Sequence, residues 1–253
     1  MEKDVAGGTC LLPGGPVGCV MVHGFGSSPG EVMGLGRYLH QLGYTVYGVL
    51  LKGHGTSPED LARTSWPDWY VSVTGGIEQL RQQCRQVWVI GLSLGGALSL
   101  YAASQGLVDG VVALAAPAGL ADWRVRLVGI GKYIMPYQHR RISRETQAFN
   151  AKVGRMVYDR LPLRAVQSLY QFIGIVRKAL PQVTVPVLVV HSLKDEVISQ
   201  NSGRYIYEHV SSTQKEYLEL QQSGHILTEG PEKEVVWQKV EEFLSKYAPL
   251  DPQ

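Results

Sequence analysis

The sequence predicts an α/β fold, in which a mostly parallel central sheet is covered by helices on both faces. Two observations support this class. Short apolar, β-branched runs alternate along the chain with longer segments of helical periodicity, and this order is typical of a parallel sheet. The chain has 253 residues, of which 45% are hydrophobic and 18% charged, so it can bury a large core as one domain.

Each predicted element has its own pattern. The strands are runs such as Val17 to Val22, in which apolar residues follow one another without a polar break. The helices repeat apolar residues at helical spacing, and the helix from residue 67 begins with proline, which the first turn tolerates. The predicted strands are residues 17–22, 44–51, 86–90, 110–115, 185–190 and 215–220, and the predicted helices are residues 31–42, 67–84, 96–103, 201–210 and 231–247.

About seventy residues between the fourth and fifth predicted strands do not fit the alternation. We interpret residues 118–182 as a small helical cap inserted into a single domain of residues 1–253, with an amphipathic helix at 164–180. Residues 120–180 hold 12 Lys and Arg against 3 Asp and Glu, so they carry +9 and the remainder −7. This charge could dock the insertion on an acidic body, bring it to anionic membranes or attract acidic substrates. The alternative is a solvated basic face.

Composition argues against several classes of protein. The net charge of +2 gives no reason to expect nucleic-acid binding, and no run approaches the roughly eighteen apolar residues of a membrane span. The three cysteines lack the spacing of a disulfide framework or a zinc site. Because no metal-ligand, phosphate-binding or dinucleotide motif is found, we expect no cofactor and no metal. The first residues lack the apolar core of a secretion signal, which favours a cytoplasmic location.

The sequence Gly-Leu-Ser-Leu-Gly at residues 91–95 lies between the predicted strand 86–90 and the predicted helix 96–103. At such a junction, Gly-x-Ser-x-Gly is typical of a nucleophile elbow, a strained turn that presents a serine hydroxyl above the sheet. Both glycines are needed because a Cβ there would collide with the neighbouring strand and helix. The alternative is an ordinary glycine-lined turn in which Ser93 only caps the helix.

A serine hydroxyl needs a general base and an acid that orients this base. Asp195 and His225 follow the fifth and sixth predicted strands, so both are expected at the carboxyl edge of the sheet, where active sites of open α/β sheets form. The chain order Ser93, Asp195, His225 is that of one group of catalytic triads. Glu196 is the alternative acid. A turn or capping role for Asp195 and a loop role for His225 also stay open.

Backbone N–H groups must stabilise the oxyanion of a tetrahedral intermediate. We assign one to Leu94, directly after the serine, and the second to Phe25, in the glycine-rich loop after the first predicted strand. His23 in the same loop is interpreted mainly as a structural hydrogen-bonding residue. Residues 53–60 form another polar loop, in which His54 has no acid partner and is expected to shape the site.

Six motifs together resemble the bacterial carboxylesterase and monoacylglycerol lipase group of the α/β-hydrolase superfamily, and they span nearly the whole chain. The resemblance implies a serine carboxylic-ester hydrolase without a cofactor, with Phe25 and Leu94 as oxyanion hole and the cap lining an acyl channel. The chain differs from this group in its Arg-rich cap, which bears on the choice of substrate. The motifs are His23-Gly24-Phe25-Gly26, Gly53-His54-Gly55-Thr56-Ser57-Pro58-Glu59-Asp60-Leu61, Trp66-Pro67-Asp68-Trp69, Gly91-Leu92-Ser93-Leu94-Gly95-Gly96, Asp195-Glu196-Val197-Ile198 and Ser223-Gly224-His225.

We therefore predict that Ser93 forms an acyl-enzyme with short- to medium-chain acyl esters, including monoacylglycerols. An acyltransferase, a thioesterase or a C–C hydrolase could use the same triad, and a ligand receptor that does not catalyse is the alternative from another class. Weak contact of the basic cap with a membrane surface is a further prediction, while the oligomeric state stays open. The apolar cap residues expected to contact the substrate are Trp123, Ile130, Ile134, Met135, Leu169, Phe172 and Ile173.

Overall fold

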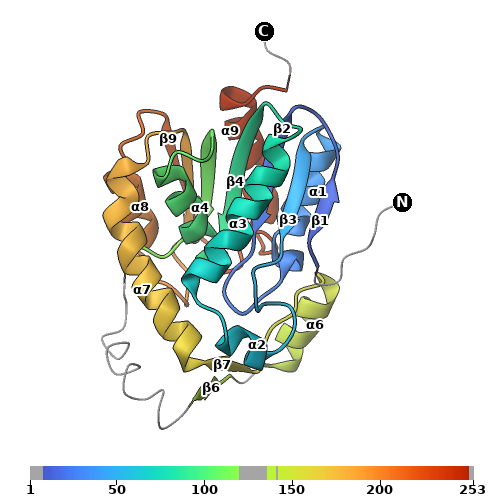
Figure 1. Cartoon of the computed structure of the whole chain (residues 1–253), viewed down its shortest axis with the longest axis vertical. Coiled ribbons are helices and arrows are strands. Elements are labelled where there is room, and N and C mark those ends of the chain that lie inside the picture. Colours follow the sequence, from blue (N-terminus) through green and yellow to red (C-terminus); the bar gives the residue numbers. More distant parts are fainter. Residues whose placement is uncertain (1–7, 120–135, 141, 251–253) are drawn as a thin grey trace.

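A computed structural model describes residues 8–119, 136–140 and 142–250. The strands of its main sheet are β1 (Cys10–Leu12), β2 (Val17–Val22), β3 (Thr45–Val49), β4 (Gln86–Leu92), β5 (Gly110–Leu114), β8 (Val187–Ser192) and β9 (Lys215–Leu220). Their order is β1-β3-β2-β4-β5-β8-β9, with β1 antiparallel to β3 and all other neighbours parallel (Figure 1). The predicted mostly parallel sheet is therefore confirmed.

Two apolar clusters, one on each face of the sheet, form the core. Side chains of a strand alternate between the faces, so Val20 and Val22 of β2 join one cluster and Cys19 and Met21 the other. The helices are α1 (Met33–Gln41), α2 (Pro58–Ala62), α3 (Trp66–Arg81), α4 (Leu94–Ser104), α6 (Arg144–Lys152), α7 (Leu163–Ala179), α8 (Ser202–His209) and α9 (Lys233–Tyr247). The first cluster packs under α3, α4, α7 and α8, and the second under α1 and α9. Helices on both faces are thus confirmed.

The segment that the sequence predicts to be an insertion, residues 118–182 and called the insertion below, contains α6, α7 and a separate two-stranded antiparallel sheet. This small sheet pairs β6 (Tyr137–His139) with β7 (Arg160–Pro162). The predicted amphipathic helix is present as α7, which packs against α4, whereas β6, α6 and β7 were not predicted. In Figure 1, β6, β7 and α6 lie with α2 at the lower end of the view. Within the described ranges, no helix is long and apolar enough to cross a membrane.

Candidate active site

Ser93 occupies a strained turn between β4 and α4. Its φ of 56° and ψ of −117° are unusual for a residue with a side chain, and its N–H donates to the carbonyl of Leu114 on the next strand at 2.8 Å. Strained backbone of this kind costs on the order of 1–3 kcal/mol and persists only where its surroundings enforce it. The conformation is the one expected of a nucleophile elbow rather than of an ordinary helix cap.

The glycines that flank Ser93 allow this turn. An added Cβ at Gly91 would lie 2.2 Å from the carbonyl oxygen of Gly95. A Cβ at Gly95 would lie 2.1 Å from the carbonyl oxygen of Val22, at the end of β2. Because no Cβ fits at such distances, the close approach of the turn to strand and helix requires glycine at both positions, as the sequence indicated.

Asp195 and His225 meet across the loops that follow β8 and β9. The Nδ1–H of His225 donates to Oδ2 of Asp195 at 2.8 Å, and the side chains are 10% and 0% exposed, respectively. The other oxygen, Oδ1, accepts the N–H groups of Val197 at 2.8 Å and Ile198 at 3.0 Å. Glu196, the alternative acid, is exposed to solvent. The carboxylate that orients this imidazole is therefore Asp195.

The charge state of Asp195 follows from these contacts. Burial by itself disfavours the carboxylate, but the hydrogen bond and charge interaction with His225, together with the two backbone donors, outweigh it and lower the pKa of Asp195. The carboxylate thus stays ionised at neutral pH. An ionised acceptor on Nδ1–H holds the imidazole of His225 in the tautomer whose Nε2 carries the lone pair.

The loop after β2 passes directly beside Ser93. A Cβ at Gly24 would lie 3.4 Å from the Cβ of Ser93. In the described part of the chain, the backbone N–H groups of Phe25 and Leu94 donate no hydrogen bond to the protein. An oxyanion needs backbone donors that are not already used by the protein and that lie close to the nucleophile. The structure therefore brings together the loop of Phe25 and the turn of Ser93.

His23 holds this loop in place through both ring nitrogens. Nδ1–H donates to the carbonyl of Gly24 at 2.8 Å, and Nε2 accepts the N–H of Leu51 at 3.1 Å. Burial lowers the pKa of His23 to about 4, so the ring is neutral at pH 7. The bond to the Gly24 carbonyl fixes the peptide group that carries the N–H of Phe25. The structural interpretation of His23 is consistent with these contacts.

The polar loop after β3 supports the same region. The ring of His54 packs edge-on against those of His23, Phe25 and Trp69, with centroids 5.3, 5.8 and 5.7 Å away. Burial, with His23 nearby, lowers the pKa of His54 to about 3. Its Nδ1–H lies 3.3 Å from the carbonyl of Lys52. His54 is therefore a neutral ring enclosed among other rings, and its role in shaping the site stays a prediction.

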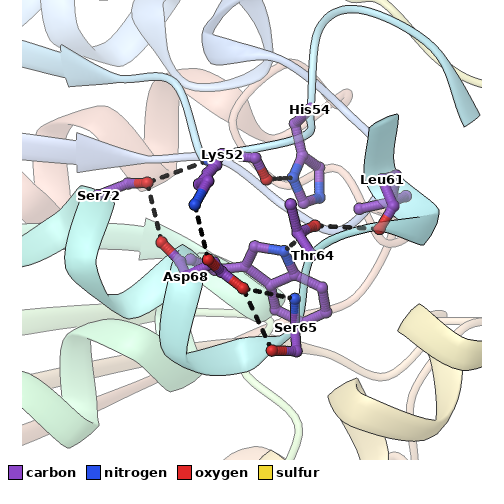
Figure 2. Close-up of polar contacts among 8 residues, drawn as sticks. Lys52, His54, Leu61, Thr64, Ser65, Asp68 and Ser72 are labelled. Carbon is purple, nitrogen blue, oxygen red and sulfur yellow. Dashed lines mark hydrogen bonds and ion pairs between the residues drawn. The ribbon is translucent and has the colours of Figure 1, made fainter. Parts of the chain in front are cut away.

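The start of α3 anchors this loop. Figure 2 shows Lys52 between two residues of the helix: its Nζ binds Oδ1 of Asp68 at 2.8 Å, and its N–H donates to the hydroxyl of Ser72 at 3.0 Å. Asp68 also accepts the N–H of Ser65 at 3.1 Å, which caps the helix. The loop therefore leaves β3 in a direction fixed by the first turn of α3.

The predicted substrate residues fall into two groups. Phe172 and Ile173 of α7 are buried, and Phe172 stacks on Trp66 with ring centroids 5.1 Å apart, while Leu169 is partly buried. Packing between α7 and the body thus occupies Phe172, and contact of these three residues with a substrate stays a prediction. The other four lie outside the described residues, namely Trp123, Ile130, Ile134 and Met135.

Sequence reasoning missed two charged residues next to the site. Glu31 and Arg155 form a buried ion pair of 2.9 Å between the loop after β2 and the insertion. No sequence pattern marks this pair, since its members are 124 positions apart. In the described part of the chain, no cluster of three or more His, Cys, Asp or Glu could hold a metal ion.

Comparisons with known proteins identify relatives of this chain. The family model described as Serine aminopeptidase, S33, matches residues 17–232. The chain is 32% identical over 235 residues to a thermostable monoacylglycerol lipase of Bacillus sp. (strain H-257), covering 92% of each chain. It is 30% identical over 240 residues to a carboxylesterase of Bacillus subtilis (strain 168), covering 92% of this chain and 94% of the relative.

A solved structure described as that of LipS and LipT, two metagenome-derived lipolytic enzymes, superimposes with a TM-score of 0.88 at 26% identity and covers 95% of this chain and 98% of that one. The match therefore includes both the body and the inserted segment. These matches show that the chain belongs to the serine hydrolase family described as Serine aminopeptidase, S33, within the α/β-hydrolases.

Proposed function

We propose that this serine hydrolase cleaves carboxylic esters through an acyl-enzyme on Ser93. The observation that carries the proposal is the strained serine at an elbow, at the same edge of the sheet as a histidine bonded to a buried aspartate. The names of the two relatives, a monoacylglycerol lipase and a carboxylesterase, support an ester as substrate.

In the proposed mechanism, Oγ of Ser93 attacks the ester carbonyl while Nε2 of His225 accepts its proton. The ionised Asp195 holds Nδ1–H and stabilises the imidazolium. The N–H groups of Phe25 and Leu94 donate to the developing oxyanion. His225 then returns the proton to the leaving alcohol. Water, activated by the same histidine, hydrolyses the acyl-enzyme and regenerates Ser93.

Short- to medium-chain acyl esters, including monoacylglycerols, are the proposed substrates. Support comes from the relatives' names and from the apolar residues that the insertion offers, Leu169 of α7 among them. Weak contact of the basic insertion with anionic membranes and a cytoplasmic location remain predictions. Sedimentation with phosphatidylglycerol vesicles and fractionation of the producing cells would check them.

The test treats the protein with p-nitrophenyl esters of several chain lengths and, separately, with a fluorophosphonate. We expect p-nitrophenol release with an optimum in chain length, and a covalent adduct that mass spectrometry locates on Ser93. The variant Ser93→Ala should lose both signals while its circular dichroism stays that of the wild type. Full turnover by this variant would refute the assignment of the nucleophile.

Other carbonyl substrates are tested in the same assay. Acyl thioesters test for a thioesterase, and aminoacyl p-nitroanilides test for an aminopeptidase. An added acceptor alcohol tests for an acyltransferase, and a β-diketone tests for a C–C hydrolase. Higher kcat/KM on any of these than on esters would replace the proposed substrate class. Tight ligand binding without turnover would instead favour a receptor that retains the hydrolase pocket.

A further inference from the structure

A buried ion pair joins the insertion to the loop after β2. Nε of Arg155 lies 2.9 Å from Oε1 of Glu31, and the two side chains are 14% and 2% exposed. Glu31 ends the short 3-10 helix Pro29–Glu31, and Arg155 follows α6. A buried charge needs a partner that compensates it, and here one partner lies in the segment after β2 and the other in the insertion.

The other oxygen of Glu31 contacts the proposed oxyanion loop. Oε2 accepts the N–H of Gly24 at 2.7 Å, and the carbonyl of Gly24 accepts Nδ1–H of His23 at 2.8 Å. The same peptide group that contains this carbonyl carries the N–H of Phe25. Two hydrogen bonds on Gly24 therefore fix the direction in which the N–H of Phe25 points.

Arg155 holds more than Glu31. Its Nε also lies 3.1 Å from the hydroxyl of Ser27, and its Nη1 donates to Oδ1 of Asn150 at 3.0 Å. The N–H of Met156, the next residue, donates to the hydroxyl of Ser28 at 3.0 Å. The guanidinium is thus oriented from both sides, by the insertion and by the loop.

The two segments also touch through backbone. A Cβ at Gly30 would lie 2.2 Å from the carbonyl oxygen of Gly154, and a Cβ at Gly26 would lie 2.9 Å from Cδ2 of Leu161 in β7. The insertion consequently rests directly on the loop that carries Phe25. A change in the insertion at this point can be transmitted to that loop without passing through any other element.

We propose that Arg155 is a positioning residue for catalysis, which acts through Glu31 and Gly24 on the N–H of Phe25. The inference rests on the proposed function, in which that N–H stabilises the oxyanion. Without Arg155, the buried carboxylate of Glu31 loses its ion-pair partner, and its hold on Gly24 weakens. Removing one oxyanion donor lowers kcat by about 10²- to 10³-fold, and displacing it should have a smaller effect.

The first test compares Arg155→Met with the matched control Arg160→Met. Arg160 also joins the insertion to the body, through Glu59 at 2.7 Å, but this pair is half-exposed, and among the described residues no hydrogen bond or ion pair links it to the loop after β2. We expect Arg155→Met to lower kcat for p-nitrophenyl butyrate by roughly 10- to 100-fold, with KM changed less than about threefold. Arg160→Met should stay within about twofold of the wild type.

A rescue separates positioning from loss of structure. Glu31→Gln retains an oxygen for the N–H of Gly24 but needs no counter-charge, so the double variant with Arg155→Met should recover part of kcat. Binding of a boronic acid, which imitates the tetrahedral intermediate, should weaken in parallel with kcat across these variants. Equal kcat in Arg155→Met and Arg160→Met, or kcat that follows only the folded fraction seen in urea titration, would overturn the proposal.

Hydrogen exchange provides a readout without catalysis. Peptides that cover residues 22–32 should exchange about tenfold faster in Arg155→Met than in the wild type and unchanged in Arg160→Met. If the wild type proves inactive on esters but exchange changes as expected, the proposed function fails and the structural link stands. Unchanged exchange, together with wild-type ester activity in Arg155→Met, refutes the link alone.

Discussion

Acidification should destabilise the folded protein, because buried imidazoles, those of His23 and His54 foremost, would have to take up protons. Burial lowers the pKa of His23 to about 4 and that of His54 to about 3, from the ordinary histidine value of 6.5. In the unfolded chain both return to about 6.5. Between these values the unfolded chain binds protons that the folded protein does not. The stabilisation is therefore fully present above pH 6.5 and is lost as the pH falls towards 4 and 3.

The size of this effect follows from proton linkage. Between pH 7 and pH 4.5, each of the two imidazoles should lower the free energy of unfolding by about 2.5 kcal/mol, and together they should lower it by about 5 kcal/mol. A typical domain has only about 5–15 kcal/mol of stability, so the change is large. Asp195 adds little in this window, because its lowered pKa places its own loss below the ordinary range of a carboxyl.

Urea unfolding followed by tryptophan fluorescence at both pH values measures this loss. The variant His54→Phe keeps a ring against Phe25 and Trp69 and removes one titrating group. Its loss between pH 7 and pH 4.5 should be smaller than that of the wild type by about 2.5 kcal/mol. The packing cost of phenylalanine cancels, because each protein is compared with itself at two pH values. Equal losses in variant and wild type would show that His54 does not drive the acid sensitivity.

Two further changes test the site. Asp195→Asn should lower kcat for esters by about 10³- to 10⁴-fold, because an amide no longer fixes the imidazole of His225, and stopped-flow release of p-nitrophenol would measure it; a loss below tenfold contradicts the assigned role. Gly95→Ala should abolish activity and destabilise the fold by more than about 2 kcal/mol, since its Cβ would lie 2.1 Å from a carbonyl oxygen. In the control Gly75→Ala in α3, the added Cβ meets nothing within 4 Å, so activity in the same assay should be unchanged. Similar behaviour of both variants would contradict the steric argument.

Long, regular patterns made most of the fold predictable. The strands β2 and β9 occupy the predicted residues, because uninterrupted apolar or alternating runs define their ends. Elements with few residues were missed, among them β1, β6, β7 and α2. The five residues of α2 are too few for a helical period, although Ser57 followed by Pro58 is a start signal that could have revealed it.

The candidate site was predictable where chemistry and strand order coincide. Ser93, Asp195 and His225 each follow a parallel strand, and parallel strands end at one edge of a sheet. Glu31 offered no comparable signal, since an acid at the start of a predicted helix is ordinarily a solvent-exposed residue that favours the helix dipole. Its burial depends on the insertion that covers it, which local sequence does not reveal.

The excess positive charge of the insertion is a second feature whose role depends on burial that local sequence does not reveal. Docking on an acidic body and a solvated basic face were both open from the sequence, and the structure contains two ion pairs of different burial between the insertion and the body. The pair of Arg160 with Glu59 is half-exposed, and such pairs contribute about 0–1 kcal/mol. Arg155 faces the buried Glu31, and loss of one partner of a buried pair costs about 3–5 kcal/mol. The two arginines are five positions apart and carry the same charge. They differ in the burial of their partners, and this difference decides that Arg155, and not Arg160, anchors the insertion at the oxyanion loop.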